Sequence, residues 1–277
     1  MDAATQAPPF RLAGRIALVT GANHGIGAAT ARTLAACGAR IVASYLQLED
    51  AADPGIPECY RHNRAQAADA VVSAIRTAGG EALALEADLC DAQAPARLFD
   101  AAEAAFGPVD ILVNNATGWH SDTFGATDRQ SLGRSVARFS AEGFDRQFGV
   151  DARGGALLIA EFARRHAARA ADWGRIVGLT SGGPNGFPGE VSYGAAKAAL
   201  ENYTMSAAFE LADCGITANM VYPPTTDTGW ITDSVRRHVA KRPDLLHIVE
   251  PEEVARVIAY LVSDEARFIT GNIIHMR

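Results

Sequence analysis

Short apolar runs alternate along the chain with longer segments in which apolar residues recur at helical spacing. The short runs cover residues 15–20, 40–45, 82–87, 109–113, 174–180, 216–222 and 272–276, and the helical patterns cover 28–36, 65–78, 91–106, 141–171, 192–213 and 251–263. Short runs that are apolar throughout are typical of strands buried on both faces, as in parallel sheets covered by helices. The alternation therefore predicts an α/β protein.

The composition fits a single large domain. The chain has 277 residues, of which 48% are hydrophobic, which is enough to bury a substantial core in one α/β unit. The formal net charge is −7, and Lys and Arg are scattered along the chain. Because nucleic acids and anionic membrane surfaces attract clustered basic residues, the charge pattern disfavours both kinds of partner.

The cysteines and the N-terminal segment predict a protein that stays in the cytoplasm. Cys37, Cys59, Cys90 and Cys214 lie far apart and lack the spacing of metal ligands, so we expect reduced thiols and no metal site. Residues 1–15 contain no long apolar core of a signal peptide, and no later run is long enough to span a bilayer. We therefore expect a soluble, cytoplasmic protein.

The segment 179–199 carries the best candidates for catalysis. Ser181 follows an apolar run, and a loop rich in glycine and proline separates it from Tyr193 and Lys197, which stand four apart where a helical pattern begins. Residues four apart share a helix face, so Tyr193 and Lys197 can point at one site, and the loop can bring Ser181 beside them. These three residues form a candidate catalytic trio.

The trio suits proton transfer at a carbonyl or alcohol. A phenol has a pKa of about 10, and a nearby ammonium such as that of Lys197 lowers this pKa by stabilising the phenolate. Tyr193 can then donate a proton to a carbonyl oxygen or take one from an alcohol, while the Ser181 hydroxyl holds the same oxygen. None of the three can carry a hydride, so a redox function requires a cofactor.

A glycine-rich turn follows the first apolar run and opens the first helical pattern. Gly21, Gly25 and Gly27 let the backbone turn sharply and approach a pyrophosphate, whose charge is stabilised by the free amides of the helix N-terminus. The turn therefore predicts a cofactor cradle made of Gly21, Asn23, His24, Gly25, Ile26 and Gly27. An ordinary tight turn is the alternative interpretation.

The end of the second apolar run favours NADP(H) as the cofactor. A carboxylate at this place would bind the adenosine ribose of NAD and repel the additional phosphate of NADP. The chain has Ser44 and Tyr45 here, with no acidic residue before Glu49, and His24 can approach the same ribose. NAD(H) is the alternative if the site tolerates both dinucleotides.

Two long segments lack strong periodicity. Residues 46–64 form an extended polar loop, which either borders the adenosine end of the cofactor through Arg61, His62 or Arg64 or is a surface insertion or oligomer contact. Residues 224–250 have only a weak helical pattern, and we expect them to form a mobile lid over the substrate.

Further candidates follow the predicted strands, at the edge where open α/β sheets bind ligands. Asp88 follows the third run, where a carboxylate can accept a hydrogen bond from adenine, and Asn114, Asn115 and Ala116 follow the fourth. The candidate walls of an apolar and aromatic substrate pocket are Trp119, His120, Phe187, Tyr222 and Trp230. His120 is also a candidate acid or base, although a lone loop histidine is more often structural or solvated.

The chain resembles the classical short-chain dehydrogenase/reductase family, because five motifs of that family occur in its order. They are Thr20-Gly21 with Gly25 and Gly27, then Asp88, then Asn114-Asn115-Ala116, then Ser181, and finally Tyr193 with Lys197. The resemblance runs from about residue 12 to the C-terminus. It implies a Rossmann-like, doubly wound parallel sheet of about seven strands with helices on both faces in a single domain, usually assembled as a tetramer or dimer.

The resemblance also implies a role for each matching residue. Tyr193 is the general acid in reduction, Lys197 lowers its pKa and holds the nicotinamide ribose, and Ser181 orients the substrate carbonyl. The remaining implied cofactor contacts are Asp88 and Leu89 to adenine, Asn115 and Ala116 to the adjoining ribose, and Pro223, Thr226 and Thr228 to the carboxamide, with Thr180 at the same site. The nicotinamide itself carries the hydride.

Three features depart from the family pattern. The family has Asn in the long helix, where it helps to hold a water that relays protons to the lysine. This chain has Asp151 instead, whose carboxylate only accepts hydrogen bonds and favours a charged Lys197. The usual Pro-Gly after the sixth strand is Pro223-Pro224, which stiffens the backbone there. The Asp-Gly-Gly common after Thr270-Gly271 is absent, so we expect different tail-mediated subunit contacts.

Three functional hypotheses follow. The first is an NADP(H)-dependent ketone reductase resembling the 3-oxoacyl-(acyl carrier protein) reductases, and the second is an NAD-preferring dehydrogenase of a secondary alcohol, sugar or steroid. The third is a dinucleotide-binding regulator without turnover, supported only by Asp151 and Pro224. Enoyl reductases of this fold place more residues between tyrosine and lysine, and dehalogenating relatives have arginine at the position of Lys197, so neither pattern is present.

Overall fold

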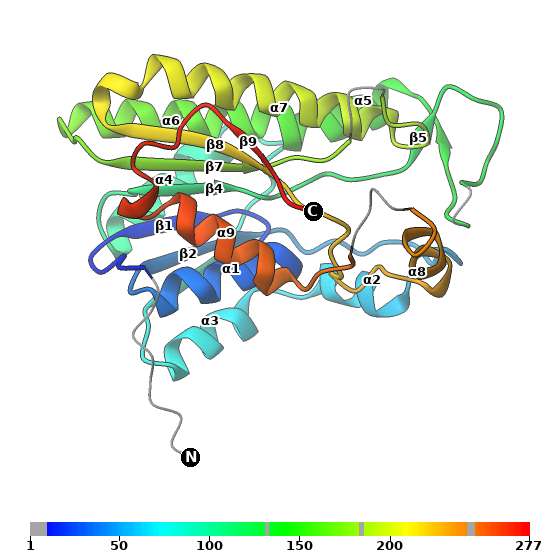
Figure 1. Cartoon of the computed structure of the whole chain (residues 1–277), viewed down its shortest axis with the longest axis horizontal. Helices are drawn as coiled ribbons and strands as arrows, with labels where there is room; N and C mark the ends of the chain where they lie inside the picture. Colours follow the sequence, from blue (N-terminus) through cyan, green and yellow to red (C-terminus); the bar gives the residue numbers. More distant parts are fainter. Residues whose placement is uncertain (1–9, 131–132, 183–185, 243–246) are drawn as a thin grey trace.

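Seven strands form one parallel sheet in the order β3-β2-β1-β4-β7-β8-β9 (Figure 1). The computed structural model describes residues 10–130, 133–182, 186–242 and 247–277. The strands are β1 (Ile16–Val19), β2 (Arg40–Tyr45), β3 (Ala82–Glu86), β4 (Ile111–Asn114), β7 (Gly174–Leu179), β8 (Ile216–Tyr222) and β9 (Ile273–His275). The first strand, β1, pairs with β2 on one side and with β4 on the other. The strand order therefore reverses at β1, and in sheets of this kind a crevice lies at this point, outside the carboxyl ends of the strands. The predicted doubly wound sheet is confirmed.

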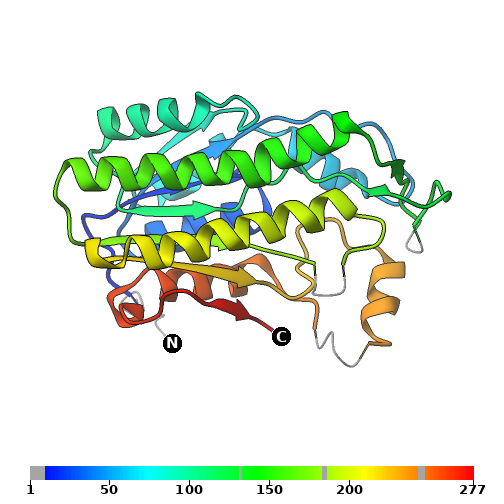
Figure 2. The same ribbon diagram turned by 90° about the horizontal axis from the view of Figure 1, so that it is seen from above.

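Helices cover both faces of this sheet (Figures 1 and 2). One face packs against α1 (Gly25–Ala36), α3 (Asp69–Thr77) and α9 (Pro251–Leu261), and the other against α4 (Ala94–Ala105), α6 (Gly155–Ala168) and α7 (Val191–Glu210). Short 3₁₀ turns follow α7 and α9, at Ala212–Cys214 and Asp264–Ala266. Among the helices of the described ranges, none combines the length and the apolar character needed to cross a membrane. The two cores belong to a single domain.

The long helix predicted at 141–171 is interrupted in its middle. Helix α5 (Ala141–Phe148) begins at Ser140, whose side chain accepts a hydrogen bond from the Gly143 amide, and one π-helical turn (Gly149–Gly154) separates it from α6. Glycines at both ends of this turn have low helix propensity, which permits the wider winding. The π turn contains Asp151, and turns of this kind often occur at functional sites.

The expected loop 46–64 is partly helical. Residues 46–57 lack helix and strand, but α2 (Glu58–Ala65) follows them. Glu58 in its first turn and Arg64 in its last turn match the helix dipole. The helix has few apolar residues, so its sequence lacks the helical spacing of apolar residues that would have predicted it.

The predicted lid, residues 224–250, contains one helix in its described part, α8 (Asp233–Val239). The two ends of the segment are joined, because Val249 donates to the Thr225 carbonyl at 3.0 Å and accepts from the Asp227 amide at 2.9 Å. Part of the lid, residues 243–246, lies outside the described residues.

The irregular segment expected at 119–139 contains two short strands, β5 (Asp122–Thr123) and β6 (Ala137–Arg138). They pair in parallel and form a small second sheet beside the start of α7. The β5–β6 segment, α2 and the lid all lie around the carboxyl edge of the main sheet.

Candidate active site

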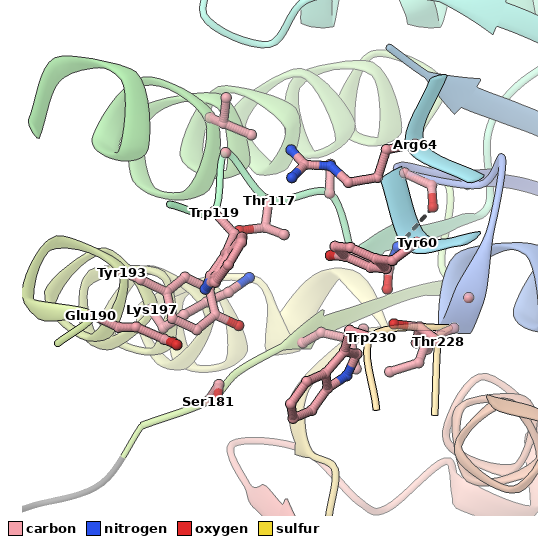
Figure 3. A pocket seen from close by; sticks show the side chains of 18 of the residues that line it. Tyr60, Arg64, Thr117, Trp119, Ser181, Glu190, Tyr193, Lys197, Thr228 and Trp230 are labelled. Atoms are coloured by element: carbon pink, nitrogen blue, oxygen red, sulfur yellow. Dashed lines mark hydrogen bonds between the residues drawn. The ribbon is translucent and has the colours of Figure 1, made fainter. Parts of the chain in front are cut away.

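A pocket of about 1150 Å³ lies at the carboxyl ends of the strands and extends from the glycine-rich turn after β1 to the first turns of α7. Most of the predicted site residues line it: Gly21, Asn23, His24, Gly25, Ile26, Ser44, Tyr45, Asp88, Leu89, Asn115, Ala116, Thr180, Ser181, Tyr193, Lys197, Pro223, Thr226 and Thr228, and the wall residues Trp119, Phe187, Tyr222 and Trp230. The candidate cofactor, catalytic and substrate residues therefore share one cavity, part of which is seen in Figure 3.

The structure brings the candidate trio together. Tyr193 and Lys197 project from the first turns of α7, and Ser181 approaches from the segment after β7 (Figure 3). Asp122 fixes the start of α7, because its carboxylate accepts hydrogen bonds from the amide (2.9 Å) and the hydroxyl of Ser192. Part of the loop between Ser181 and α7, residues 183–185, lies outside the described residues.

Lys197 forms a buried ion pair with Asp151. The distance from Lys197 Nζ to Asp151 Oδ1 is 2.8 Å, and the two side chains are 2% and 0% exposed. The other carboxylate oxygen of Asp151 accepts hydrogen bonds from Gln147 Nε2 at 2.6 Å, the Gly118 amide at 2.9 Å and the Thr117 hydroxyl at 3.1 Å. These donors fix the carboxylate, so the ammonium of Lys197 faces a full negative charge.

The environment of Tyr193 keeps its hydroxyl protonated. Burial raises the pKa of Tyr193, and the nearby carboxylates of Asp151 and Glu190 raise it further, while a hydrogen bond with Ser181 acts in the opposite direction. Burial is the largest of these causes, so the pKa of Tyr193 is raised on balance. That Lys197 lowers this pKa stays a prediction.

Hydrogen bonds from β4 hold the glycine-rich turn in shape. The Asn115 side-chain amide donates to the carbonyls of Thr20 and Gly21 at 2.9 and 3.0 Å, and the Thr20 hydroxyl accepts from the amides of Asn115 and Ala116, both at 3.0 Å. Gly25 has φ +55°, a left-handed conformation that favours glycine. Since its side-chain N–H groups hold the turn, Asn115 supports the cradle as well as lining it.

His24 immediately precedes α1 and is neutral at physiological pH. Burial lowers the pKa of its imidazole to about 4, and the charge of Arg64 acts in the same direction. The His24 Nδ1 atom lies 3.2 Å from the Asn23 side-chain oxygen. His24 can therefore contribute hydrogen bonding beside a phosphate group, but not a positive charge.

Some of the predicted residues do not line the pocket. Gly27 lies behind the turn, where a Cβ atom would stand 2.1 Å from the Gly21 oxygen, and Asp151 lies behind Lys197. Asn114 is 3% exposed, and its side-chain amide donates to the Gly155 carbonyl at 3.3 Å. The prediction of His120 as a pocket wall is wrong: its Nε2 is 3.7 Å from Asp122 Oδ2, and its ring packs against Gly143 in the first turn of α5.

The pocket also contains residues that the sequence did not single out for the substrate site. Arg134 is 7% exposed, and its guanidinium lies 4.5 Å from the Trp230 ring centre and 5.4 Å from that of Trp119. It pairs with Glu190 at 3.4 Å. Burial raises the pKa of Glu190, opposed by hydrogen bonding from Trp119 and by the charge of Arg134. In the sequence, the one feature that could have drawn attention to this ion pair is the position of Glu190, three residues before Tyr193.

Helix α2 and the lid meet over the cofactor side of the pocket. Tyr60 and Arg64 of α2 line the pocket together with Thr228 and Trp230 of the lid (Figure 3). The Cys59 thiol donates to the Gly229 carbonyl at 3.2 Å. These contacts place α2 at the pocket, which Arg64 lines and which Arg61 and His62 do not line. That this segment borders the adenosine end of a cofactor stays a prediction.

Within the described ranges, no group of three His, Cys, Asp or Glu side chains lies close enough together to hold a metal ion.

Comparison with known proteins matches this architecture to one family. A family model described as enoyl-(acyl carrier protein) reductase matches residues 58–276. The chain belongs to the classical short-chain dehydrogenase/reductase family. Its order of motifs and its sheet are those expected of that family, and it is accordingly an oxidoreductase that acts on alcohol or carbonyl groups.

Two bacterial members of the short-chain dehydrogenase/reductase family are similar to this chain over nearly their whole length. The uncharacterized oxidoreductase YjdA of Bacillus subtilis is 36% identical over 264 residues, which is 94% of each chain. The cis-4-hydroxycyclohexanecarboxylate dehydrogenase of Sinomonas cyclohexanicum is 37% identical over 264 residues, again 94% of each chain.

A solved structure of the family shows the same fold with a cofactor. The short-chain dehydrogenase from Burkholderia cenocepacia J2315 in complex with NADP superposes with a TM-score of 0.79 at 30% identity, covering 96% of this chain and 97% of that chain. Dinucleotide binding is thus found in a close structural neighbour of this short-chain dehydrogenase/reductase.

Proposed function

We propose that the protein is an NADP(H)-dependent carbonyl reductase that converts a ketone to a secondary alcohol. The observation that carries this proposal is the convergence of Ser181, Tyr193 and Lys197 in the pocket that also contains the glycine-rich turn. In this reaction Tyr193 donates a proton to the carbonyl oxygen as the general acid, and Ser181 holds that oxygen. The nicotinamide supplies the hydride when it is bound.

Tyr193 carries the proton that a general acid needs. Burial raises its pKa above the ordinary phenol value of about 10, so the hydroxyl is protonated at neutral pH. Lys197, fixed by Asp151, holds the nicotinamide ribose and orients Tyr193 from the same helix face. In this proposal Asp151 is a positioning residue, because it acts through Lys197 and lies behind it.

The residues around the adenosine side fit NADP(H) better than NAD(H). Ser44 and Tyr45 end β2 without a carboxylate that would repel a second phosphate on the ribose. The turn itself fits a dinucleotide, since Gly25 adopts a left-handed conformation and Gly27 leaves no room for a side chain. Adenine contacts by Asp88 and Leu89 and carboxamide contacts by Pro223, Thr226 and Thr228 complete the proposed site.

We further propose a ring-sized substrate. Trp119, Phe187, Tyr222 and Trp230 supply flat apolar surface, and the Arg134–Glu190 pair adds polar groups to the same wall. A ring that bears a carbonyl or hydroxyl and a second polar group matches this combination. The name of the Sinomonas relative describes such a ring alcohol, which supports this substrate class for the present chain.

The assembly is proposed to be a homo-oligomer, dimer or tetramer, in the cytoplasm. Four phenylalanines form a chain of ring contacts across α5 and the β5–β6 segment, Phe124, Phe139, Phe144 and Phe148, and Phe124 is 77% exposed. An aromatic surface of this kind is typical of subunit contacts. The single domain with a lid at 224–250 is part of the same proposal.

Two alternative functions are distinguished from the carbonyl reductase by the measurements described below. One is an NAD-preferring dehydrogenase of a secondary alcohol, sugar or steroid, and the other is a dinucleotide-binding regulator without turnover. An enoyl reductase, the activity named in the description of the family model, is disfavoured by the four-residue spacing of Tyr193 and Lys197.

Two measurements test the proposal. The wild-type protein is titrated with NADPH and with NADH, with nicotinamide fluorescence as the signal, and then assayed with a panel of cyclic ketones and one enoyl thioester. We expect tighter binding of NADPH and reduction of a ketone. Preference for NADH would favour the alcohol dehydrogenase, and binding without turnover of any ketone would favour the regulator.

The variant Tyr193→Phe tests whether Tyr193 is the general acid of the reaction. We expect this variant to lose about 10²- to 10⁴-fold in kcat while its affinity for the dinucleotide stays the same. Tyr203→Phe is the matched control, because Tyr203 lies on the same helix, is 47% exposed and does not line the pocket. Equal activity of both variants would contradict the assigned role of Tyr193.

A further inference from the structure

Arg64 is a buried cation of the pocket wall with little to bind within the protein. It is 6% exposed, lies in the last turn of α2 and lines the pocket. In the part of the chain that the structure describes, the only polar partner of its guanidinium is the Asp50 carboxylate, with 2.9 Å between Nη1 and Oδ2. The Tyr60 ring, with its centre 5.8 Å from Arg64 Cζ, supports the side chain (Figure 3).

The ion pair with Asp50 uses one nitrogen of this guanidinium, and Asp50 is itself 23% exposed at its side chain. Arginine carries five N–H donors. No nitrogen of Arg64 is among the fully buried side-chain atoms that lack a partner in the described residues. The remaining donors are therefore open to the pocket that Arg64 lines, which is the arrangement expected of an anion-binding arginine.

The protein holds Arg64 against the glycine-rich turn. The Asn23 side chain, within that turn, donates to the Gln66 carbonyl at 2.9 Å and to the Asn63 carbonyl at 3.4 Å, on either side of Arg64 in the chain. These two contacts tie the end of α2 to the proposed phosphate cradle. The Leu48 amide, from the segment before α2, donates to the Arg64 carbonyl at 3.0 Å and fixes the backbone there.

A phosphate bound at the glycine-rich turn would be stabilised by a positive charge, which the turn itself does not supply. The turn offers backbone amides, and its one titratable side chain, His24, is neutral at physiological pH because its pKa is about 4. Lys197 is already paired with Asp151 in α7 and the π turn. Arg64 brings a permanent positive charge to the cofactor side of the pocket, from a helix that lies outside the turn.

We propose that Arg64, held beside the glycine-rich turn, binds a phosphate group of the dinucleotide. The inference rests on the proposed function, because it requires a dinucleotide in this pocket. A guanidinium can hold a phosphate through two parallel hydrogen bonds and still keep a contact to Asp50. The phosphate is either one of the central diphosphate, common to both dinucleotides, or the 2′-phosphate of NADPH.

The test measures binding rather than turnover. Wild type, Arg64→Gln, Arg64→Lys and the control Arg97→Gln are titrated with NADPH and with NADH by nicotinamide fluorescence. Arg97 lies in α4, its side chain is 60% exposed and it does not line the pocket. Loss of a charged hydrogen-bonding partner raises Kd about 10- to 100-fold, so we expect this change in Arg64→Gln, a smaller one in Arg64→Lys and less than about twofold in Arg97→Gln.

The two dinucleotides distinguish the source of the phosphate. If Arg64 binds the diphosphate, Arg64→Gln weakens NADPH and NADH equally. If it binds the 2′-phosphate, only NADPH is weakened, and the preference of the wild type for NADPH disappears in the variant. Either result supports the proposal.

Unchanged affinity of Arg64→Gln for both dinucleotides overturns the proposal. If the wild type itself binds neither dinucleotide, the proposed function fails first, so the two failures are distinguishable. Thermal unfolding of each variant without ligand checks that it is folded. If Arg64→Gln is not, Arg64→Met, which keeps the aliphatic stem of the side chain, takes its place under the same criterion.

Discussion

Lys197 and Asp151 form an ion pair that is closed off from solvent, with Nζ and Oδ1 2.8 Å apart. An asparagine at position 151, as in the family pattern, would offer the same oxygen without a charge. The carboxylate instead raises the pKa of Tyr193, in addition to the larger effect of burial. The catalytic helix therefore carries a more weakly acidic tyrosine than the motif alone indicates.

Asp151→Asn should shift the pH dependence of reduction. Removing this negative charge lowers the pKa of Tyr193, because Asp151 contributes to raising it. Reduction needs the protonated phenol, so the alkaline loss of kcat/KM should begin at lower pH in the variant than in the wild type. The groups facing Tyr193, namely Ser181, Glu190, Lys197 and Tyr60, stay unchanged in the variant. In a profile of kcat/KM between pH 6 and 11 the wild type should stay flat at the alkaline end, because the pKa of Tyr193 is raised. A variant that is equally flat to pH 11 would contradict this role of Asp151.

The trio and the strands were predictable because each depends on local pattern. β2 and β8 have the predicted bounds, 40–45 and 216–222, since a run of buried apolar residues is bounded by polar or turn residues on both sides. Tyr193 and Lys197 meet because helix geometry alone places residues four apart on one face.

The outer wall of the pocket was not predictable in the same way. Tyr60, Arg64 and Arg134 lie in segments with little apolar periodicity, and they become buried only through contacts with residues far away in the chain. His120 was misplaced for a similar reason, because its direction depends on the pairing of β5 with β6. The shift of the Tyr193 pKa required the position of Asp151, which a π turn sets.

The Arg134–Glu190 ion pair in the pocket wall should contribute to the free energy of unfolding. Breaking a buried pair leaves one uncompensated charge, which destabilises a protein by about 3 kcal/mol. We therefore expect Arg134→Met to lower the free energy of unfolding by about this amount, and the double variant Arg134→Met with Glu190→Gln to recover much of it. Urea unfolding of wild type, both single variants and the double variant measures the coupling. Additive effects of the two substitutions would show that the 3.4 Å contact contributes no interaction energy.

His24 should make the protein less stable in weak acid. Its pKa is about 4 in the folded protein against an ordinary value of 6.5, so the unfolded chain binds the additional proton first as the pH falls. The stabilising effect of the neutral imidazole is complete above pH 6.5 and is lost between pH 6.5 and about 4, at no more than about 1.4 kcal/mol per pH unit. His24→Gln, which cannot titrate, should show a flatter dependence of Tm on pH over this range. Parallel curves for the two proteins would rule out His24 as the titrating group.

Gly27→Ala should remove dinucleotide binding through a contact rather than through backbone conformation. A Cβ atom at position 27 would stand 2.1 Å from the Gly21 oxygen and 2.6 Å from Asn115 Nδ2. Both belong to the bonds that shape the turn, so the turn has to move away from α1 and the cradle is lost. We expect at least a tenfold rise in the Kd of NADPH and a fall in stability of about 1–3 kcal/mol, as for other overpacked sites.

The control for this substitution is Gly125→Ala, in the β5–β6 segment, where the nearest atom to a Cβ is the Thr123 hydroxyl oxygen at 3.3 Å. That variant should bind NADPH like the wild type, because a flexible surface side chain can yield by a few tenths of an ångström. Titration and thermal unfolding of both variants separate the two effects. If Gly27→Ala bound NADPH as tightly as Gly125→Ala, the close packing of Gly27 on Gly21 would not be what shapes the cradle, and the dinucleotide would have to be held mainly by the other walls of the pocket.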